Sequence, residues 1–147
     1  MIAIILVATA ASALAAADVP SAACLAGKRQ ALIEGGFTGP LVCSTKDATF
    51  RLVGRTSGDG YSVYDYRYRF LPHPGGVMHG GQRVVIFRGR KYAGQYVLSP
   101  PPPTSLTVSG TDILLQTSGS REKVRLDFSS RPPSELTING ETERFQR

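Results

Sequence analysis

The sequence predicts a mainly β fold: a single antiparallel β-meander domain, built as a small barrel or sandwich of about seven to nine strands, with a short N-terminal helix. From residue 49 onward, segments rich in Val, Ile, Tyr, Phe and Thr recur about every ten residues, separated by turn-forming sequences such as SGDG, PHPGG, RGRK and NG. The chain beyond residue 17 has about 130 residues, enough for one domain with a hydrophobic core and short for two. We therefore expect residues 18–48, which hold the helix, and residues 49–147, which hold the strands, to form one folded unit.

Residues 1–17 have the pattern of a secretory signal peptide. The segment MIAIILVATAASALAAA contains no charged side chain, opens with an apolar run and ends with Ala15 and Ala17 in an A-x-A arrangement before Asp18. A membrane-spanning helix needs about 20 predominantly apolar residues, and this segment is shorter. We expect cleavage after Ala17, export to the periplasm or the cell exterior, and no transmembrane segment in the mature chain.

Cys24 and Cys43 predict one disulfide in the N-terminal segment. An even number of cysteines in an exported chain indicates a disulfide rather than a metal or redox site. Closing a loop of about twenty residues stabilises a fold by roughly 3 kcal/mol. The same segment contains SAACLAGKRQALIEGG, in which the apolar residues between Leu25 and Ile33 have helical spacing and Gly35 is a stop signal. The disulfide is expected to tie this helix to the β-sheet region.

Three later segments predict how the strands are arranged. The apolar run VVIF, residues 84–87, indicates a central strand that is buried on both faces. KVRLDF, residues 123–128, alternates, so that Val124, Leu126 and Phe128 should point inward. The consecutive prolines within SPPPPT, residues 99–104, supply no hydrogen-bond donors to a sheet. We expect them to form a stiff crossing between a basic, tyrosine-rich half and a neutral half.

The segment YSVYDYRYRF, residues 61–70, predicts a strand with two different faces. Side chains alternate along a strand, so one face receives the rings of Tyr64, Tyr66, Tyr68 and Phe70. The opposite face receives Val63, Asp65, Arg67 and Arg69. A nucleic-acid platform needs rings and cations on one connected surface, so no nucleic-acid partner is expected. The aromatic face is expected to belong to the core.

The preceding segment TFRLVGRT, residues 49–56, is expected to pair with this strand through a three-residue loop at residues 58–60, with Gly60 left-handed. This register places Ser57 opposite Tyr61 and Arg51 opposite Arg67. Like charges that face each other destabilise a sheet by up to ~1 kcal/mol. Either Asp65 or an external anion is therefore expected to compensate the arginines.

The positive charge is concentrated in one part of the chain. The formal net charge is +6, and residues 51–91 hold eight basic side chains against two acidic ones, which gives 8 − 2 = +6. Guanidinium groups suit phosphate and carboxylate, so the candidate anion-binding residues are Arg51, Arg55, Arg67 and Arg69. The leading hypothesis is an exported, non-enzymatic cell-envelope protein that binds anionic lipid, an anionic polymer or an acidic protein. The alternative is that these arginines are only solvated.

Catalytic and metal-binding patterns are weak in this sequence. The segment LPHPGGVMHGG, residues 71–81, is expected to be a loop and contains both histidines, His73 and His79, which are weak metal-ligand candidates. A third ligand would have to be Asp59 or Asp65. Because no nucleophile elbow or phosphate-binding loop is present, we expect no catalytic residues, no metal and no cofactor. A metal-dependent or hydrolytic enzyme is the third alternative.

A short turn carries one family resemblance. SGDGY, residues 57–61, resembles the S-G-x-x-Y loop of periplasmic inhibitors of c-type lysozyme, over five residues and without the companion W-x-K-G motif. The resemblance implies an exported, disulfide-linked β-barrel that plugs an active site with this loop. The second function hypothesis is therefore a secreted inhibitor or protein-interaction module that uses residues 57–61 or the loop at 71–81.

Overall fold

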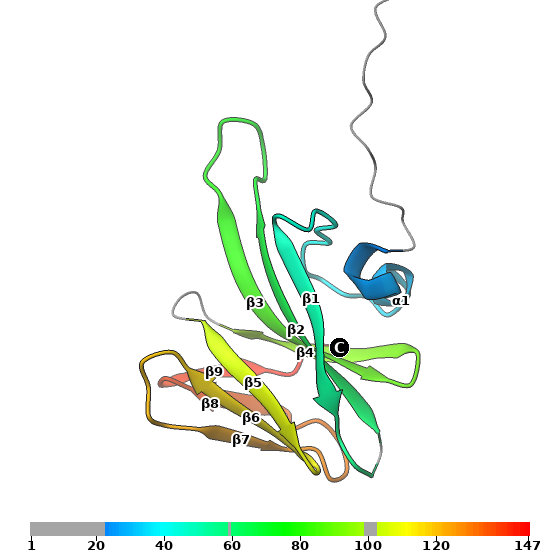
Figure 1. Ribbon diagram of the computed structural model, residues 1–147, viewed down its shortest axis with the longest axis vertical. Coiled ribbons are helices and arrows are strands. Elements are labelled where there is room, and N and C mark those ends of the chain that lie inside the picture. The colour runs from blue at the N-terminus through cyan, green and yellow to red at the C-terminus, as the bar shows by residue number, and fades with distance from the viewer. Residues whose placement is uncertain (1–22, 59, 99–102) are drawn as a thin grey trace, which may run out of the picture.

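The protein is described by a computed structural model that covers residues 23–58, 60–98 and 103–147, so the predicted signal peptide lies outside the described residues. These residues form nine strands in three antiparallel sheets (Figure 1). Sheet A contains β1 (Ala48–Arg55), β2 (Tyr61–Phe70), β3 (His79–Arg88) and β4 (Lys91–Leu98). Sheet B contains β5 (Thr104–Ser109), β6 (Asp112–Thr117) and β7 (Val124–Asp127), and sheet C contains β8 (Glu135–Ile138) and β9 (Glu141–Arg144). Consecutive strands are neighbours in every sheet, which confirms the predicted meander.

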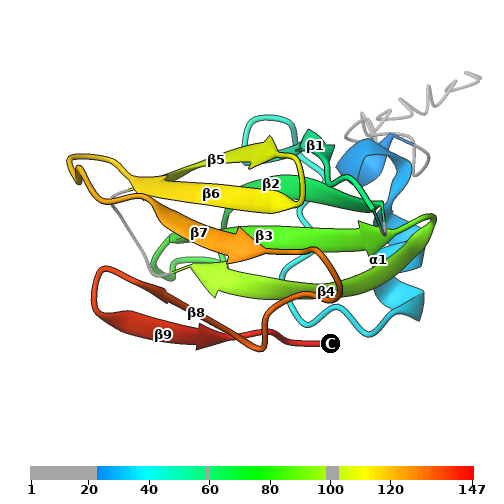
Figure 2. The same cartoon turned by 90° about the horizontal axis from the view of Figure 1, so that it is seen from below.

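Sheets B and C together cover one face of sheet A (Figure 2). Their inward side chains interdigitate with those of β2, β3 and β4 in one apolar cluster that includes Val63, Ile86, Tyr96, Ile113 and Phe128. The predicted mainly β class is confirmed. The described residues form a layered sandwich and no closed barrel.

A short N-terminal segment covers the other face of sheet A. It contains a 3-10 turn, η1 (Cys24–Gly27), and a helix, α1 (Arg29–Glu34). The prediction of one helix through this segment is wrong in detail, because Leu25 and Ala26 adopt left-handed φ angles of 53° and 54° and interrupt it. The interruption turns Leu25 into the core, where it joins Leu32 and the ring of Phe87.

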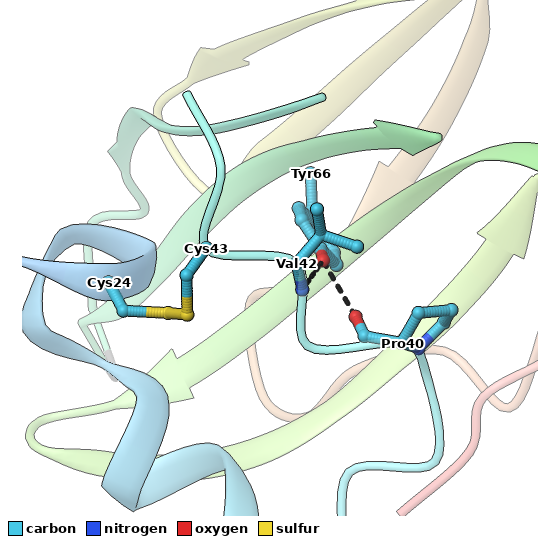
Figure 3. Close-up of a disulfide and its surroundings, with 5 residues drawn as sticks. All are labelled: Cys24, Pro40, Val42, Cys43 and Tyr66. Carbon is cyan, nitrogen blue, oxygen red and sulfur yellow. Dashed lines mark hydrogen bonds between the residues drawn. A yellow bond between two sulfur atoms is a disulfide. The ribbon is translucent and has the colours of Figure 1, made fainter. Parts of the chain in front are cut away.

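A disulfide closes this segment on itself, and a buried tyrosine of β2 holds the segment against the sheet (Figure 3). Cys24 and Cys43 form the predicted disulfide, with their Cα atoms 4.8 Å apart. The Tyr66 hydroxyl donates to the Pro40 carbonyl at 2.6 Å and accepts from the Val42 amide at 3.0 Å. Burial raises the pKa of the Tyr66 phenol. One strand residue therefore satisfies two backbone groups of an irregular segment.

Several predicted burial patterns are confirmed. Residues 84–87 of β3 are fully buried, and Leu126 and Phe128 point inward. On the aromatic face of β2, Tyr64 and Tyr66 are buried, but Tyr68 and Phe70 are half-buried. This face is covered by the N-terminal segment, and the β2–β3 hairpin extends beyond that segment (Figure 1), so the end of β2 loses cover.

The predicted register of β1 against β2 is wrong by two residues over most of its length. Phe50 lies opposite Tyr66, and Arg51 lies opposite Asp65 rather than Arg67. The hairpin closes at Thr56, whose amide donates to the Tyr61 carbonyl at 2.9 Å and whose hydroxyl accepts from the Tyr61 amide at 3.1 Å. Gly60 has the predicted left-handed φ, at 66°. The predicted repulsion between facing arginines therefore does not arise.

A bulge in β1 shifts the register by one residue between Leu52 and Gly54, so that the prediction is wrong by one residue beyond it. It brings Gly54 against β5, where an added Cβ atom would lie 3.0 Å from the Cβ of Val108. Only glycine fits this approach without displacing its neighbour. Because of the bulge, the last side chains of β1 lie on the opposite faces of the sheet from those that unbroken alternation would give.

Tyr66→Phe is expected to lower the free energy of unfolding by about 1–3 kcal/mol, because the Pro40 carbonyl and the Val42 amide each lose a partner. Urea denaturation followed by circular dichroism measures the loss. Tyr64→Phe is the matched control, since Tyr64 lies on the same strand and face and stacks through its ring on Phe50. Equal effects of the two substitutions would contradict this role for Tyr66.

Candidate anion-binding site

A buried carboxylate lies at the centre of the predicted arginine cluster. The Asp65 side chain is only 4% exposed, and its Oδ2 lies 3.1 Å from Nε of Arg67 and 3.8 Å from Nη2 of Arg51. Its Oδ1 accepts a hydrogen bond from Nε2 of Gln82 at 2.9 Å. Asp65 is therefore shared by two guanidinium groups and one amide. Asp65 is the internal compensating charge that the sequence analysis named as one of two possibilities, the other being an external anion.

The same carboxylate begins a hydrogen-bonded network that reaches the second layer of the fold, which consists of sheets B and C. The Gln82 amide nitrogen donates to the Thr104 carbonyl at 2.6 Å, and its oxygen accepts from the Thr104 amide at 2.9 Å. Arg67 also donates to the Thr104 carbonyl, from Nη2 at 3.0 Å. Two side chains from sheet A, Gln82 and Arg67, thus converge at the first residue of β5.

The hydrogen-bonded network continues across sheets B and C. The Thr104 and Thr117 hydroxyls lie 3.3 Å apart, and the Asn139 amide donates to the Thr117 hydroxyl at 2.7 Å. Asn139 occupies the β8–β9 turn with a left-handed φ of 52°. Polar contacts therefore connect all three sheets, starting from Asp65.

Arg69 has a different partner. Its Nε donates to Oδ1 of Asp47 at 2.8 Å, and its backbone amide donates to the Asp47 carbonyl at 2.8 Å. The hydrogen bond from Arg69 lowers the pKa of the Asp47 carboxyl below its ordinary value. The segment before β1 is thereby attached to the upper part of β2, with Lys46 beside it.

Arg55 does not join the other three arginines. The bulge in β1 pairs Arg55 with Ser62, and Ser62 shares its face of β2 with Tyr64. Arg51 and Arg67 lie on the opposite face, with Asp65. The structure therefore brings together Arg51 and Arg67 at Asp65, places Arg69 two residues beyond Arg67 on β2, and separates Arg55 from them.

Two surface hollows meet at Arg67. One has a volume of about 310 Å³ and is lined by residues that include Lys46, Asp47 and Arg69. The other, of about 360 Å³, lies against β6 and the following turn and is lined by residues that include Ser105 and Ser120. The four cations Lys46, Arg51, Arg67 and Arg69 face two carboxylates, Asp47 and Asp65, which leaves 4 − 2 = +2. This group of four cations and two carboxylates is called the arginine site below.

The two histidines lie at the β2–β3 turn and not in a cluster of ligands. The His73 ring lies against Gly76, and the His79 ring lies 5.7 Å from the Phe70 ring. His79 is already part of β3, so the predicted loop at 71–81 is shorter than expected. Across the described ranges, no group of three or more His, Cys, Asp or Glu side chains is placed to hold a metal ion.

The sequence reasoning missed Gln82, Asp47 and Lys46. Gln82 had a usable signal, because period-two counting back from Ile86 and Val84 places it on a core face, where a polar side chain needs a partner. Asp47 and Lys46 had none, because their position depends on the path of the irregular segment after Cys43.

Comparisons with known proteins identify no relative of this chain. No family model, curated protein or solved structure matches this chain. The turn at residues 57–61 lies at the other end of sheet A from the arginine site, and the Ser57 amide donates to the Gly110 carbonyl at 2.9 Å. Within the described part of the chain, no helix has the length and apolar character needed to cross a bilayer. The disulfide is compatible with an exported protein.

Asp65→Asn is expected to lower the free energy of unfolding by about 1–3 kcal/mol. An amide cannot accept from both Gln82 and Arg67, because one of its two polar atoms is a donor. Asp47→Asn is the control, since the Asp47–Arg69 pair is exposed and its loss should change stability little. Chemical denaturation measures the free energy of unfolding of both variants. An unchanged free energy of unfolding for the Asp65→Asn variant would contradict the network's role.

Proposed function

We propose that the protein is an exported, non-enzymatic binding protein of the cell envelope that contacts an acidic partner through Arg51, Arg67 and Arg69. The observation that carries this proposal is the sharing of one buried carboxylate by two arginines. Export is supported by the signal-peptide pattern of residues 1–17 and by the disulfide.

The shared carboxylate supports binding because it orients Arg67 and leaves both arginines partly exposed. Arg67 uses Nε and Nη2 for Asp65 and Thr104, yet its side chain is 42% exposed. Arg51 is 65% exposed, and its 3.8 Å separation from Asp65 is too long for a hydrogen bond. A guanidinium held in place loses less side-chain entropy when it binds an anion.

The chemistry of the site favours a partner that carries phosphate or carboxylate groups. Guanidinium groups bind such anions through paired N–H donors. The two hollows on either side of Arg67 are open to solvent-borne groups, and their lining includes the hydroxyl-bearing residues Thr45 and Ser120. These are hydrogen-bond donors without a negative charge.

The test is binding to inorganic polyphosphate, a soluble probe, by fluorescence anisotropy at low and high salt. Arg51→Ala combined with Arg67→Ala should weaken binding roughly tenfold or more, because contacts to charged groups contribute about 1.5–3 kcal/mol each. Wild-type affinity should also fall as salt rises. Arg51→Ala alone, which removes an exposed guanidinium, keeps the test readable if the double variant is unstable.

The charge-matched control is Arg125→Ala combined with Arg144→Ala. These arginines pair with Asp112 and Glu135 on strands of the second layer. Equal losses in the two double variants, or no binding of the wild type at low salt, would refute the arginine site as the binding surface.

A second candidate function is a protein-interaction module that uses the β2–β3 turn. The observation that favours it is the exposure of Leu71, Val77 and Met78 in that turn. Inhibition of a lysozyme or a protease by excess purified protein would support this candidate over the first.

A further inference from the structure

The tip of the β2–β3 hairpin, residues 71–78, carries exposed apolar side chains. Leu71 is 46% exposed, Val77 77% and Met78 52%, and they are three of the five exposed large hydrophobic residues in the described part of the chain. The hairpin projects past the strands of sheets B and C (Figure 1). These side chains therefore gather where no other layer of the fold reaches them. Residues 71–78 are called the hairpin tip below.

The hairpin tip has a defined shape. The Gly76 amide donates to the His73 carbonyl at 3.1 Å, and the His73 ring fills the space beside Gly76. Gly75 has a left-handed φ of 77°, which suits glycine. Pro72 and Pro74 restrict the backbone on the way into the turn. An apolar surface that is already ordered loses little conformational entropy on binding.

Aromatic side chains form the next tier below the hairpin tip. The Tyr68 and Phe70 rings lie 6.2 Å apart, and the Phe70 and His79 rings lie 5.7 Å apart. The Tyr68 hydroxyl accepts a hydrogen bond from Nε of Arg83 at 3.0 Å. Rings with one apolar and one polar side are favoured at the boundary between lipid tails and headgroups.

Cations lie at the same level of the hairpin as these rings, on the opposite face of β2. Residues 66–83 include Arg67, Arg69 and Arg83 and contain no Asp or Glu, and the ion-pair partners of Arg67 and Arg69, Asp65 and Asp47, lie outside this range. Strand geometry places Arg69 about 7 Å from Leu71, at roughly 3.4 Å per residue. Apolar groups of peripheral proteins enter the headgroup and acyl boundary by about 5–10 Å. When the hairpin tip lies at that depth, Arg69 reaches the level of the lipid phosphates.

We propose that the hairpin tip inserts Leu71, Val77 and Met78 into the surface of an anionic lipid bilayer, while Arg69 and Arg67 contact lipid phosphates. The proposal rests on the proposed function for its acidic partner and names that partner as a membrane. An apolar tip with rings and cations behind it matches the order of chemistry from the acyl region outward. A protein partner with an apolar groove would explain only the exposed apolar side chains of the hairpin tip.

A single tryptophan reporter tests the insertion, because the chain contains no Trp. Val77→Trp is mixed with vesicles of phosphatidylglycerol and phosphatidylcholine, and Ile33→Trp, at an exposed apolar position on α1, is the control. For the Val77→Trp variant we expect a blue shift of the tryptophan emission and quenching by brominated lipids, with neither change for the Ile33→Trp variant. Vesicle binding without a change in the emission of the Val77→Trp variant would overturn the proposal, as would the absence of vesicle binding.

Serine substitutions test the apolar contact without changing charge. Val77→Ser with Met78→Ser should weaken binding to the anionic vesicles by about tenfold or more. Ile33→Ser with Leu52→Ser, which removes two exposed apolar side chains elsewhere, should leave binding within about twofold of the wild type. Equal losses in the two pairs, or unchanged binding of the tip variant, would overturn the insertion.

The polyphosphate assay separates this proposal from the proposed function. Serine substitutions in the hairpin tip should leave polyphosphate binding unchanged, because the arginine site is intact. Salt-dependent polyphosphate binding together with no vesicle insertion would overturn the bilayer proposal and leave the anion-binding function standing. If the hairpin tip instead captures a protein partner through Val77 and Met78 and leaves vesicles unbound, the bilayer proposal is also overturned.

Discussion

The Asp65 carboxylate is the contact on which the arrangement of the three sheets depends. An ionised carboxylate is costly to bury unless charges and hydrogen bonds compensate it, and here Arg67, Arg51 and Gln82 supply both. Gln82 then holds the first residue of β5 through two hydrogen bonds. This polar network enters sheet B at its first residue, Thr104, so it specifies how the second layer meets the first.

Burial of β2 on both of its faces is the second constraint. One face packs on sheets B and C, and the other receives the segment that Tyr66 and the Cys24–Cys43 disulfide hold in place. Both covers end before the strand does, and residues 67–70 of β2 and the start of β3 are half-buried or exposed (Figure 1). The arginine site lies where cover is lost, and the hairpin tip lies beyond it. Charge and exposed apolar surface therefore gather at one end of the molecule.

The sequence was informative about faces and weak about register. Alternation in residues 61–70 assigns each side chain to its face, because a side chain's face is fixed within its own strand. The unbroken apolar run at 84–87 correctly predicts a strand buried on both faces. The register depended on Thr56, whose side chain closes the hairpin one residue earlier than the glycine pattern suggests. The position of Arg55 depended on the bulge beside Gly54, which follows from the contact with Val108 in a distant strand. Such contacts between layers leave no local pattern in the sequence.

The central claim is that the projecting end of the β2–β3 hairpin, with the arginine site beside it, is the surface that meets an acidic partner. Hydrogen–deuterium exchange of the disulfide-linked protein, with and without phosphatidylglycerol vesicles, tests it most directly because exchange reports where amides become protected. The account predicts slower exchange in residues 71–78 and in the adjoining segment around Lys46. Protection confined to the opposite end of sheet A, around Arg55 and residues 88–91, would contradict it.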